Sequence, residues 1–375
     1  MKNHSALGTV AVWTSLLLAP AGPSPAAAQA PVIDLRPAQA PLSDGFSRIR
    51  GVLELPDGRL LVADQTEKAM WRVDLDRGSR ERIGGVGAGP DEFASPVGLY
   101  AFGRVQALVV DIGNNRLAVL DSAQRMTSTM PLFGGQRSIP DAADDAGRMY
   151  FDDATSLRVR KSEGRADGDR AWVLRWDERA KRLDSIAPLT IPGPPNPGPF
   201  PAWDRWAADR TGRVLVVRNQ AEYRVDWYHP DGRRVSGAVV NEPRHRLGEA
   251  ERLAWQKAHP RGGMSAVSMS RDGEAPPPPR PRPDVEFPDY LPYANDRDLW
   301  IDASGRGWVG RNLPAGESRA TYDVFDASGR RIARVRLPEG REVVGFGARG
   351  LYAVRRDDVD LLWLERYDVT AVPGG

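Results

Sequence analysis

Short apolar runs that follow a glycine-containing turn recur along this chain. Residues 57–64 show the pattern: Asp57-Gly58-Arg59 forms a turn signal, four apolar residues follow, and Asp64 ends the run. The pattern returns at residues 103–111, 147–152, 212–218, 305–311 and 349–355, which makes six copies. The runs are short and rich in β-branched and aromatic residues, which predicts buried β-strands.

Further apolar segments surround each copy and complete a larger unit. Every copy except the last is followed by a second hairpin, such as residues 227–235 or 324–332, with Asp-Gly or Ser-Gly at the turn. An apolar segment such as residues 50–55 also precedes each copy. Units of four strands that repeat radially predict an all-β fold, a six-bladed β-propeller. Two separate β-sandwich domains would require a central linker and no common period, which the regular copies disfavour.

The length of the chain leaves room for insertions between units. Six blades require about 240–270 residues, and the surplus falls at residues 188–202 and 241–289. We interpret 241–289 as an insertion between blades four and five. It contains a predicted helix at 247–258 with Leu247, Ala250, Leu253 and Ala254 along one stripe, followed by a proline-rich stretch at 276–283. The insertion is either a lid or docking arm over the channel mouth or a tolerated surface loop.

The ends of the repeat array predict how the ring closes. The last unit, residues 341–369, is one strand short, and the strand-like segment at 32–35 belongs to no complete unit. We therefore expect residues 32–35 to supply the outer strand of blade six, so that an N-terminal strand closes the ring.

The first 30 residues have the features of a secretory signal peptide. A weakly positive start precedes an apolar run at 11–21, and Ala28-Gln29-Ala30 provides a small-x-small cleavage site. The run is too short to span a bilayer, and no later segment is apolar enough to do so. The sequence thus predicts a signal peptide at 1–30, a propeller domain at 31–375, and a periplasmic or secreted protein.

Composition and charge exclude several classes of function. The 375 residues include no Cys, which excludes disulfides, cysteine-ligated zinc, iron–sulfur clusters and a cysteine nucleophile. The 52 Lys and Arg residues nearly balance the 50 Asp and Glu residues, which argues against a nucleic-acid partner. We expect a monomer.

One repeat resembles the NHL-repeat family of propellers. Residues 83–96 contain a glycine-rich lead-in that continues as Gly-Pro-Asp-Glu-Phe-Ala-Ser-Pro, and a strand and Asn114-Asn115-Arg116 follow. The family pattern is a Gly-Pro-x-Glu-Phe-x-x-Pro lead-in, a strand, and Asn-x-Arg at the start of the third strand. The match covers about one repeat, so the resemblance implies the fold and not an activity. Residues 290–293 and 302–309 also look like exported bacterial six-bladed propellers.

The ends of the six second strands provide candidate binding residues. In a propeller, these ends lie on the face that also carries the blade-to-blade connections, and we expect the insertion on the same face. Acidic residues end the run in blades one to three, and arginine with or without asparagine ends it in blades four to six. The candidate ligand-binding face comprises Asp64, Asp111, Asp152, Arg218, Asn219, Arg311, Asn312 and Arg355. Arginine forks could hold a carboxylate, phosphate or sulfate, and the acidic half could hold Ca²⁺. For each residue taken on its own, turn formation or solvation is the more common explanation, and the segregation of signs over six positions is what favours a binding role.

Catalytic motifs are scarce in the sequence. Only His229, His245 and His259 follow the signal peptide, without metal-ligand spacing, and no Gly-x-Ser-x-Gly elbow, P-loop or dinucleotide fingerprint is present. Two function classes remain. The first is an exported non-catalytic propeller, without a cofactor, that binds a protein, peptide or glycan at its channel-mouth face. The alternative is a Ca²⁺-dependent hydrolase or lyase such as a lactonase-like enzyme, which rests on fold analogy and would require convergent carboxylates or amides at the channel mouth.

Overall fold

The structure is a computed structural model of the chain that describes residues 30–38, 42, 44–132, 139–166, 168–194, 198–259 and 285–374. For residues 296 and 297 only the backbone is described. The predicted signal peptide, apart from Ala30, and the proline-rich stretch at 276–283 lie outside the described residues. Within these ranges, no helix has the length and apolar character that crossing a membrane requires.

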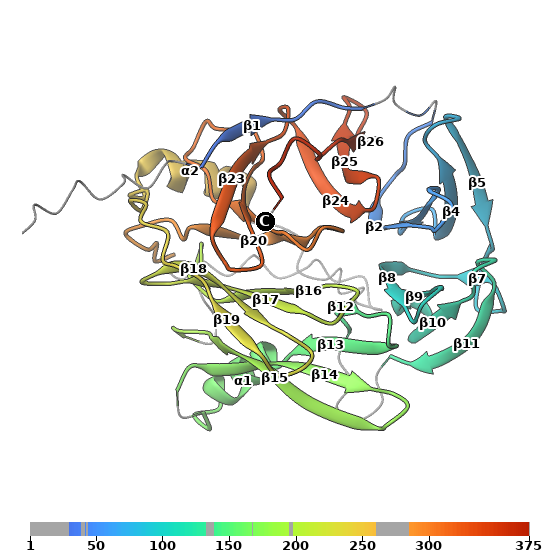
Figure 1. Cartoon of the computed structure of the whole chain (residues 1–375), viewed down its shortest axis with the longest axis horizontal. Coiled ribbons are helices and arrows are strands. Elements are labelled where there is room, and N and C mark those ends of the chain that lie inside the picture. Colours follow the sequence, from blue (N-terminus) through green and yellow to red (C-terminus); the bar gives the residue numbers. More distant parts are fainter. Residues whose placement is uncertain are drawn as a thin grey trace, which may run out of the picture. The chain divides into compact units, whose positions relative to one another are not determined.

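Residues 31–375 contain the six predicted blades, arranged around a centre at which the first strand of each blade lies (Figure 1). In each of the first three blades, four antiparallel strands follow one another from the centre outwards. Blade one is β2 (Ile49–Glu54), β3 (Leu60–Asp64), β4 (Ala69–Asp74) and β5 (Ser79–Ile83); blade two is β8 (Pro96–Phe102), β9 (Gln106–Asp111), β10 (Arg116–Leu120) and β11 (Met126–Pro131); blade three is β12 (Ala142–Ala143), β13 (Arg148–Asp152), β14 (Arg170–Asp177) and β15 (Arg182–Thr190). The short strands β6 (Gly85–Val86) and β7 (Glu92–Phe93) and the 3-10 helix η1 (Ile112–Asn114) lie in connections.

The last three blades follow the same order, with one strand fewer in blade six. Blade four is β16 (Arg205–Ala208), β17 (Val214–Asn219), β18 (Tyr223–Tyr228) and β19 (Arg234–Ser236); blade five is β20 (Ala294–Ile301), β21 (Gly307–Arg311), β22 (Thr321–Phe325) and β23 (Arg331–Arg336); blade six is β24 (Arg341–Gly347), β25 (Gly350–Arg356) and β26 (Leu362–Tyr367). All six predicted apolar runs form second strands. This confirms the repeat and the six-bladed fold.

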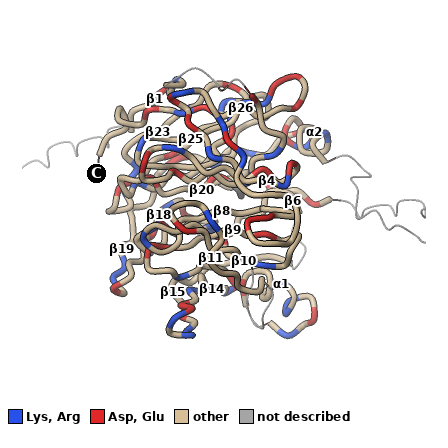
Figure 2. Tube along the Cα trace, turned by 90° about the vertical axis from the view of Figure 1, so that its right-hand side faces the viewer, with Lys and Arg blue, Asp and Glu red and all other residues tan. Residues whose placement is uncertain are grey.

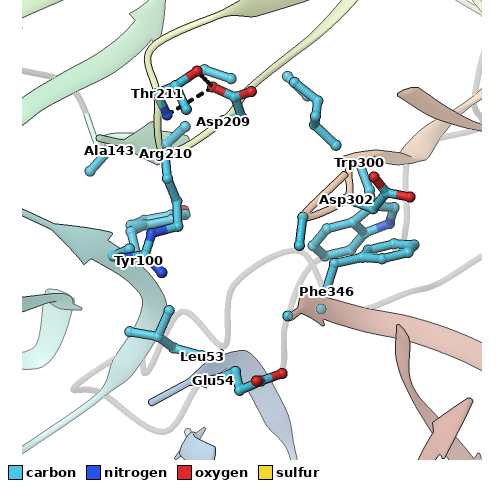
Figure 3. A pocket seen from close by; sticks show the side chains of 18 of the residues that line it. Leu53, Glu54, Tyr100, Ala143, Asp209, Arg210, Thr211, Trp300, Asp302 and Phe346 are labelled. Atoms are coloured by element: carbon cyan, nitrogen blue, oxygen red, sulfur yellow. Dashed lines mark hydrogen bonds between the residues drawn. The ribbon is translucent and has the colours of Figure 1, made fainter. Parts of the chain in front are cut away.

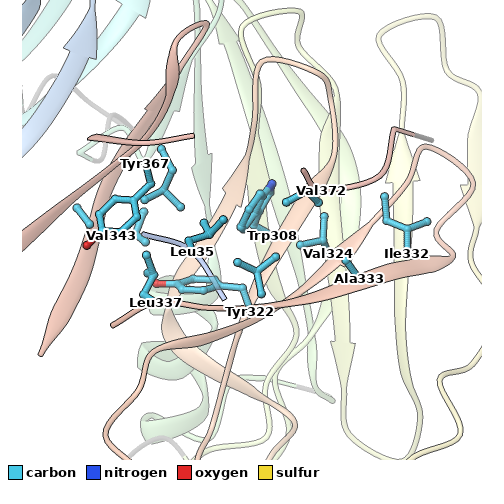
Figure 4. Close-up of a cluster of buried hydrophobic side chains, with 13 residues drawn as sticks. Leu35, Trp308, Tyr322, Val324, Ile332, Ala333, Leu337, Val343, Tyr367 and Val372 are labelled. Carbon is cyan, nitrogen blue, oxygen red and sulfur yellow. The ribbon is translucent and has the colours of Figure 1, made fainter. Parts of the chain in front are cut away.

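Each second strand is apolar on both faces because both faces pack against a neighbouring blade. In β3, Leu60 and Val62 belong to the cluster shared with blade six, whereas Leu61 and Ala63 belong to the cluster shared with blade two. One such cluster lies between each pair of adjacent blades. Figure 4 shows the cluster between blades five and six, which Leu35 of the N-terminal segment also joins.

The position predicted for residues 32–35 is wrong. Strand β1 (Val32–Asp34) pairs in parallel with β23 as a fifth strand of blade five, not as the outer strand of blade six. The Asp34 carboxylate lies 3.0 Å from both Nε and Nη2 of Arg336 and also pairs with Arg319, which favours this edge. The following segment covers the edge of blade six instead.

Pro37, Ala38 and Phe46 close the ring. The Ala38 amide donates to the carbonyl of Arg366 at 2.7 Å, and Phe46 and Leu362 exchange two backbone hydrogen bonds of 2.8 Å. These contacts lie at the two ends of β26, so the N-terminal segment does close the ring, although with residues later than those predicted. Phe46 is fully buried and packs edge-to-face on Trp71 of blade one.

Two helices project from the same side of the ring, as Figure 2 shows. Helix α1 (Ala154–Ser162), between β13 and β14, was not predicted from the sequence. Helix α2 (Glu249–Ala258), between β19 and β20, matches the helix predicted at 247–258, but the predicted stripe is wrong. Leu253 is 55% exposed, whereas Glu251 is buried and Trp255 is half-buried against Phe287. The helix therefore faces the body through Glu251, which accepts hydrogen bonds from the backbone amides of Gly248 and Ala315.

Candidate functional site

The acidic residues at the ends of the first two second strands hold backbone turns. Asp64 is fully buried and accepts hydrogen bonds from the backbone amides of Ser47 and Glu67 at 2.8 and 3.0 Å. Asp111 is fully buried as well, and accepts from the amide of Ser95 at 2.8 Å and from Asn114 Nδ2 at 2.7 Å. These carboxylates tie the chain that precedes each blade to the end of its second strand.

The arginines of blades four to six face buried acids on the third strand of their own blade. Arg218 Nε lies 2.9 Å from Asp226 Oδ2, and Arg311 Nη1 lies 3.1 Å from Asp323 Oδ2. Arg355 Nε lies 3.8 Å from Glu365 Oε1. The corresponding third-strand positions in blades one to three are Trp71, Ala118 and Leu174, which carry no charge. The segregation of signs that the sequence shows thus follows from internal pairing, and Figure 2 shows acidic and basic positions interspersed over the blades.

The arginines of blade five also hold a carboxylate from the predicted insertion. Glu242 lies 2.9 Å from Arg311, 2.5 Å from Arg331 and 2.8 Å from Arg334. Burial alone would raise the pKa of Glu242, but the arginines lower it to about 2. The carboxylate that these arginines bind in the structure is therefore Glu242 of the same chain, not that of a ligand.

The remaining predicted residues also have intramolecular partners. Asn219 exchanges two hydrogen bonds with the backbone of Ala294, and Asn312 donates to the carbonyl of the same residue at 2.9 Å. Asp152 accepts from Trp206 Nε1 at 2.8 Å and from the amide of Ala154. Apart from the two asparagines, the structure does not bring the eight residues into one cluster, and their role in ligand binding stays a prediction.

A cavity of about 690 Å³ lies in the centre of the ring. The first strands of all six blades line it, together with the turns that connect first to second strands in five blades. It is a concave site of the size that holds small ligands. Figure 3 shows its wall from within. None of the eight predicted residues lines it, because second-strand ends lie at the other face of the ring.

Aromatic residues from four blades form much of the cavity wall. Tyr100 comes from β8, Trp206 from β16, Trp300 from β20 and Phe346 from β24. Each lies two or three residues before the turn that leads to the second strand. The sequence analysis missed these residues because its candidates came from the ends of the second strands, and the four aromatic residues do not share one register position in the first strands.

Rigid turns hold the cavity rim. In the turn at 302–306, Asp302 Oδ1 accepts from the amides of Ser304 and Arg306, and Oδ2 accepts from Arg306 Nε at 2.6 Å. Gly305 has a φ of +79°, which a residue with a side chain rarely adopts. Residues 144–148 and 209–213 repeat the same Asp-x-x-Gly-Arg arrangement. In these three blades, the Gly-Arg signal at the start of the predicted run is therefore part of a structural clamp.

Asp141 is a carboxylate that faces the cavity and has no hydrogen-bond or ion-pair partner within the described residues. It precedes β12, and its side chain is accessible from the cavity. Burial within the ring and the negative charge of Asp152 together raise the pKa of Asp141 to about 7. Burial and Asp141 in turn raise the pKa of Tyr100. A carboxylate of this kind in a cavity is typical of functional sites.

Glu54 is a second cavity acid without a cationic partner in the described ranges. Its Oε2 accepts from Tyr352 Oη at 2.6 Å and from the amide of Arg349 at 3.0 Å, which are both neutral donors. A Cβ at Gly347 would lie 2.0 Å from Glu54 Oε2, so glycine at this position leaves room for the carboxylate. Glu54 is thus fixed at the cavity wall by its surroundings.

Over the part of the chain that the structure describes, no group of three or more His, Asp or Glu side chains could hold a metal ion. The convergent carboxylates that a Ca²⁺-dependent hydrolase or lyase would require are therefore not found there.

The sequence matches no protein-family model and no curated protein. Among solved structures, it is similar to a Bacteroides fragilis protein thought to be exported, with 11% identity over 90% of this chain and 99% of that chain and a TM-score of 0.52. A member of the DUF4221 family from Bacteroides vulgatus has 12% identity, covers 89% and 97%, and has a TM-score of 0.48. Virginiamycin B lyase from Staphylococcus aureus has 9% identity, covers 90% and 89%, and has a TM-score of 0.41. At these identities, similarity concerns the fold alone.

Proposed function

We propose that this protein is an exported, non-catalytic binding protein that takes part of a protein, peptide or glycan ligand into its central channel. The observation that carries the proposal is the 690 Å³ cavity, to which all six blades contribute. Aromatic walls supply apolar contact area with few rotatable bonds, and a few placed polar groups supply orientation, as in ligand pockets generally. Export rests on the predicted signal peptide at 1–30. We also propose that the repeat at 83–121 is of the NHL type.

The two turns of blade five provide a matched pair of variants for the test. Residues 302–306 and 326–330 have the same sequence, Asp-Ala-Ser-Gly-Arg, and the same clamp. Ala303 lines the cavity, whereas Ala327 does not, and both are exposed. Ala303→Trp therefore adds bulk at the cavity rim, and Ala327→Trp makes the same change in the same turn away from the cavity.

The experiment is an affinity selection on the immobilised protein with one library of short peptides and one of oligosaccharides. We expect the unaltered protein and Ala327→Trp to retain the same ligands and Ala303→Trp to lose them. Equal retention by all three proteins, or retention of nothing above the blank matrix, would show that the channel is not a binding site.

A further inference from the structure

The charges that line the cavity do not balance. The cavity wall includes two cations, Arg210 and Arg213, and each is paired with an acid of the same wall: Arg210 Nε donates to Asp145 at 3.0 Å and Arg213 Nε to Asp209 at 2.8 Å. Asp302 is paired with Arg306 behind the wall. Asp141 and Glu54 have no cation at ion-pair distance among the described side chains. The wall thus carries two uncompensated carboxylates, and the low-dielectric ring concentrates their field in the cavity.

The aromatic wall presents ring surface and few hydrogen-bond donors. The indole N–H of Trp206 is bound to Asp152, and the indole nitrogen of Trp300 is buried. An anionic ligand would therefore meet two repelling carboxylates and only arginines that are already paired. A cation gains from both parts of the wall, because a carboxylate forms charge-assisted hydrogen bonds with it and aromatic faces attract it.

We infer that the channel binds an organic cation, a primary ammonium group that points at Asp141 with its carbon chain against the aromatic wall. The inference rests on the proposed function and names the ligand chemistry of the same cavity. A lysine side chain of a peptide and a free amine share this chemistry. The cavity selects the ammonium group and its apolar stem, and excludes carboxylates and phosphates of similar size.

The test compares matched probes by isothermal titration calorimetry at pH 8. A pentapeptide with one central lysine and blocked ends is compared with the same peptide carrying norleucine, which has a similar chain and no charge. Benzylammonium and benzyl alcohol make the same comparison for a free amine. We expect about tenfold or tighter binding of the charged member of at least one pair. Preference within the peptide pair identifies a lysine side chain as the source, and preference within the benzyl pair alone identifies a free amine.

Two aspartate variants locate the effect. Asp141→Asn removes the cavity charge, and Asp358→Asn makes the same change at an exposed turn on the other face of blade six. We expect Asp141→Asn to abolish the preference for the charged probe and Asp358→Asn to keep it. Equal affinity for charged and neutral probes, or an unchanged preference in Asp141→Asn, would overturn the inference. If the library selection yields ligands that Ala303→Trp loses, but none is cationic, the inference fails while the proposed function stands.

Discussion

Asp141 costs the folded protein free energy, and its replacement should show this directly. Because the folded pKa is about 7 and the ordinary value is 3.8, the folded state holds a proton between these values that the unfolded chain releases. Stability therefore falls as the pH rises from about 4 to about 7, and the full penalty remains above pH 7. Asp141→Asn cannot ionise and escapes the penalty.

The size of the effect follows from the same difference in pKa. The difference between about 7 and 3.8 corresponds to an upper bound of about 4 kcal/mol. Because Asp141 is exposed and solvent screens its charge, we expect a gain of about 1–2 kcal/mol. The assay is urea unfolding of the ligand-free protein, followed by tryptophan fluorescence at pH 4 and pH 8. Asp141→Asn should equal the unaltered protein at pH 4 and exceed it at pH 8, and Asp358→Asn should show neither change.

An equal or lower free energy of unfolding for Asp141→Asn at pH 8 would refute the reasoning, because it would mean that Asp141 has a stabilising partner. The groups that interact electrostatically with Asp141 are Asp152 and the hydroxyl of Tyr100, and neither provides such a partner among the residues described. A residue that lowers stability at a proposed binding site fits the trade-off common at functional sites.

Three further outcomes follow from the structure. Phe46→Ala should lower the free energy of unfolding by about 3–5 kcal/mol in urea titrations, because it empties a buried site where the ring closes; a loss below about 1 kcal/mol would contradict that role. Glu242→Gln should lower stability by about 2–3 kcal/mol at pH 7, since three arginines would share Asp323 alone. That difference should shrink as the pH falls from about 4.5 to 2, where Glu242 itself becomes protonated. Millimolar Ca²⁺ added after EDTA should leave the melting temperature unchanged, whereas a clear rise would favour the metal-dependent alternative.

The sequence predicted the blades because their second strands are apolar on both faces. Leu60 to Ala63 must face two neighbouring blades, so the run has no polar interruption and is visible without an alignment. The turn clamps were visible for a related reason, since Gly305 and its counterparts require a positive φ. Features that recur in successive blades can therefore be read from short segments of the sequence.

The features missed depend on contacts between distant segments. Strand β1 could have joined either of two sheet edges, and the pairing of Asp34 with Arg336 decides between them. Helix α2 buries the acid Glu251 because the backbone amide of Ala315 donates a hydrogen bond to it. A search for apolar residues at helical spacing does not detect such a contact. The charge pattern at the second-strand ends suggested a ligand-binding face for the same reason. Arg218 and Arg311 instead form ion pairs with buried acids on the next strand, which the sequence pattern does not show.

The absence of cysteine allows the most direct test of channel binding. Ala348→Cys places one thiol at the cavity rim, and Ala327→Cys places one at an exposed turn outside it. The measurement is the rate at which a maleimide modifies each thiol, with and without a saturating ligand from the library selection. Binding in the channel predicts a slower reaction at residue 348 and an unchanged rate at residue 327. Equal rates at residue 348 with and without ligand would place the ligand elsewhere and contradict the proposed site.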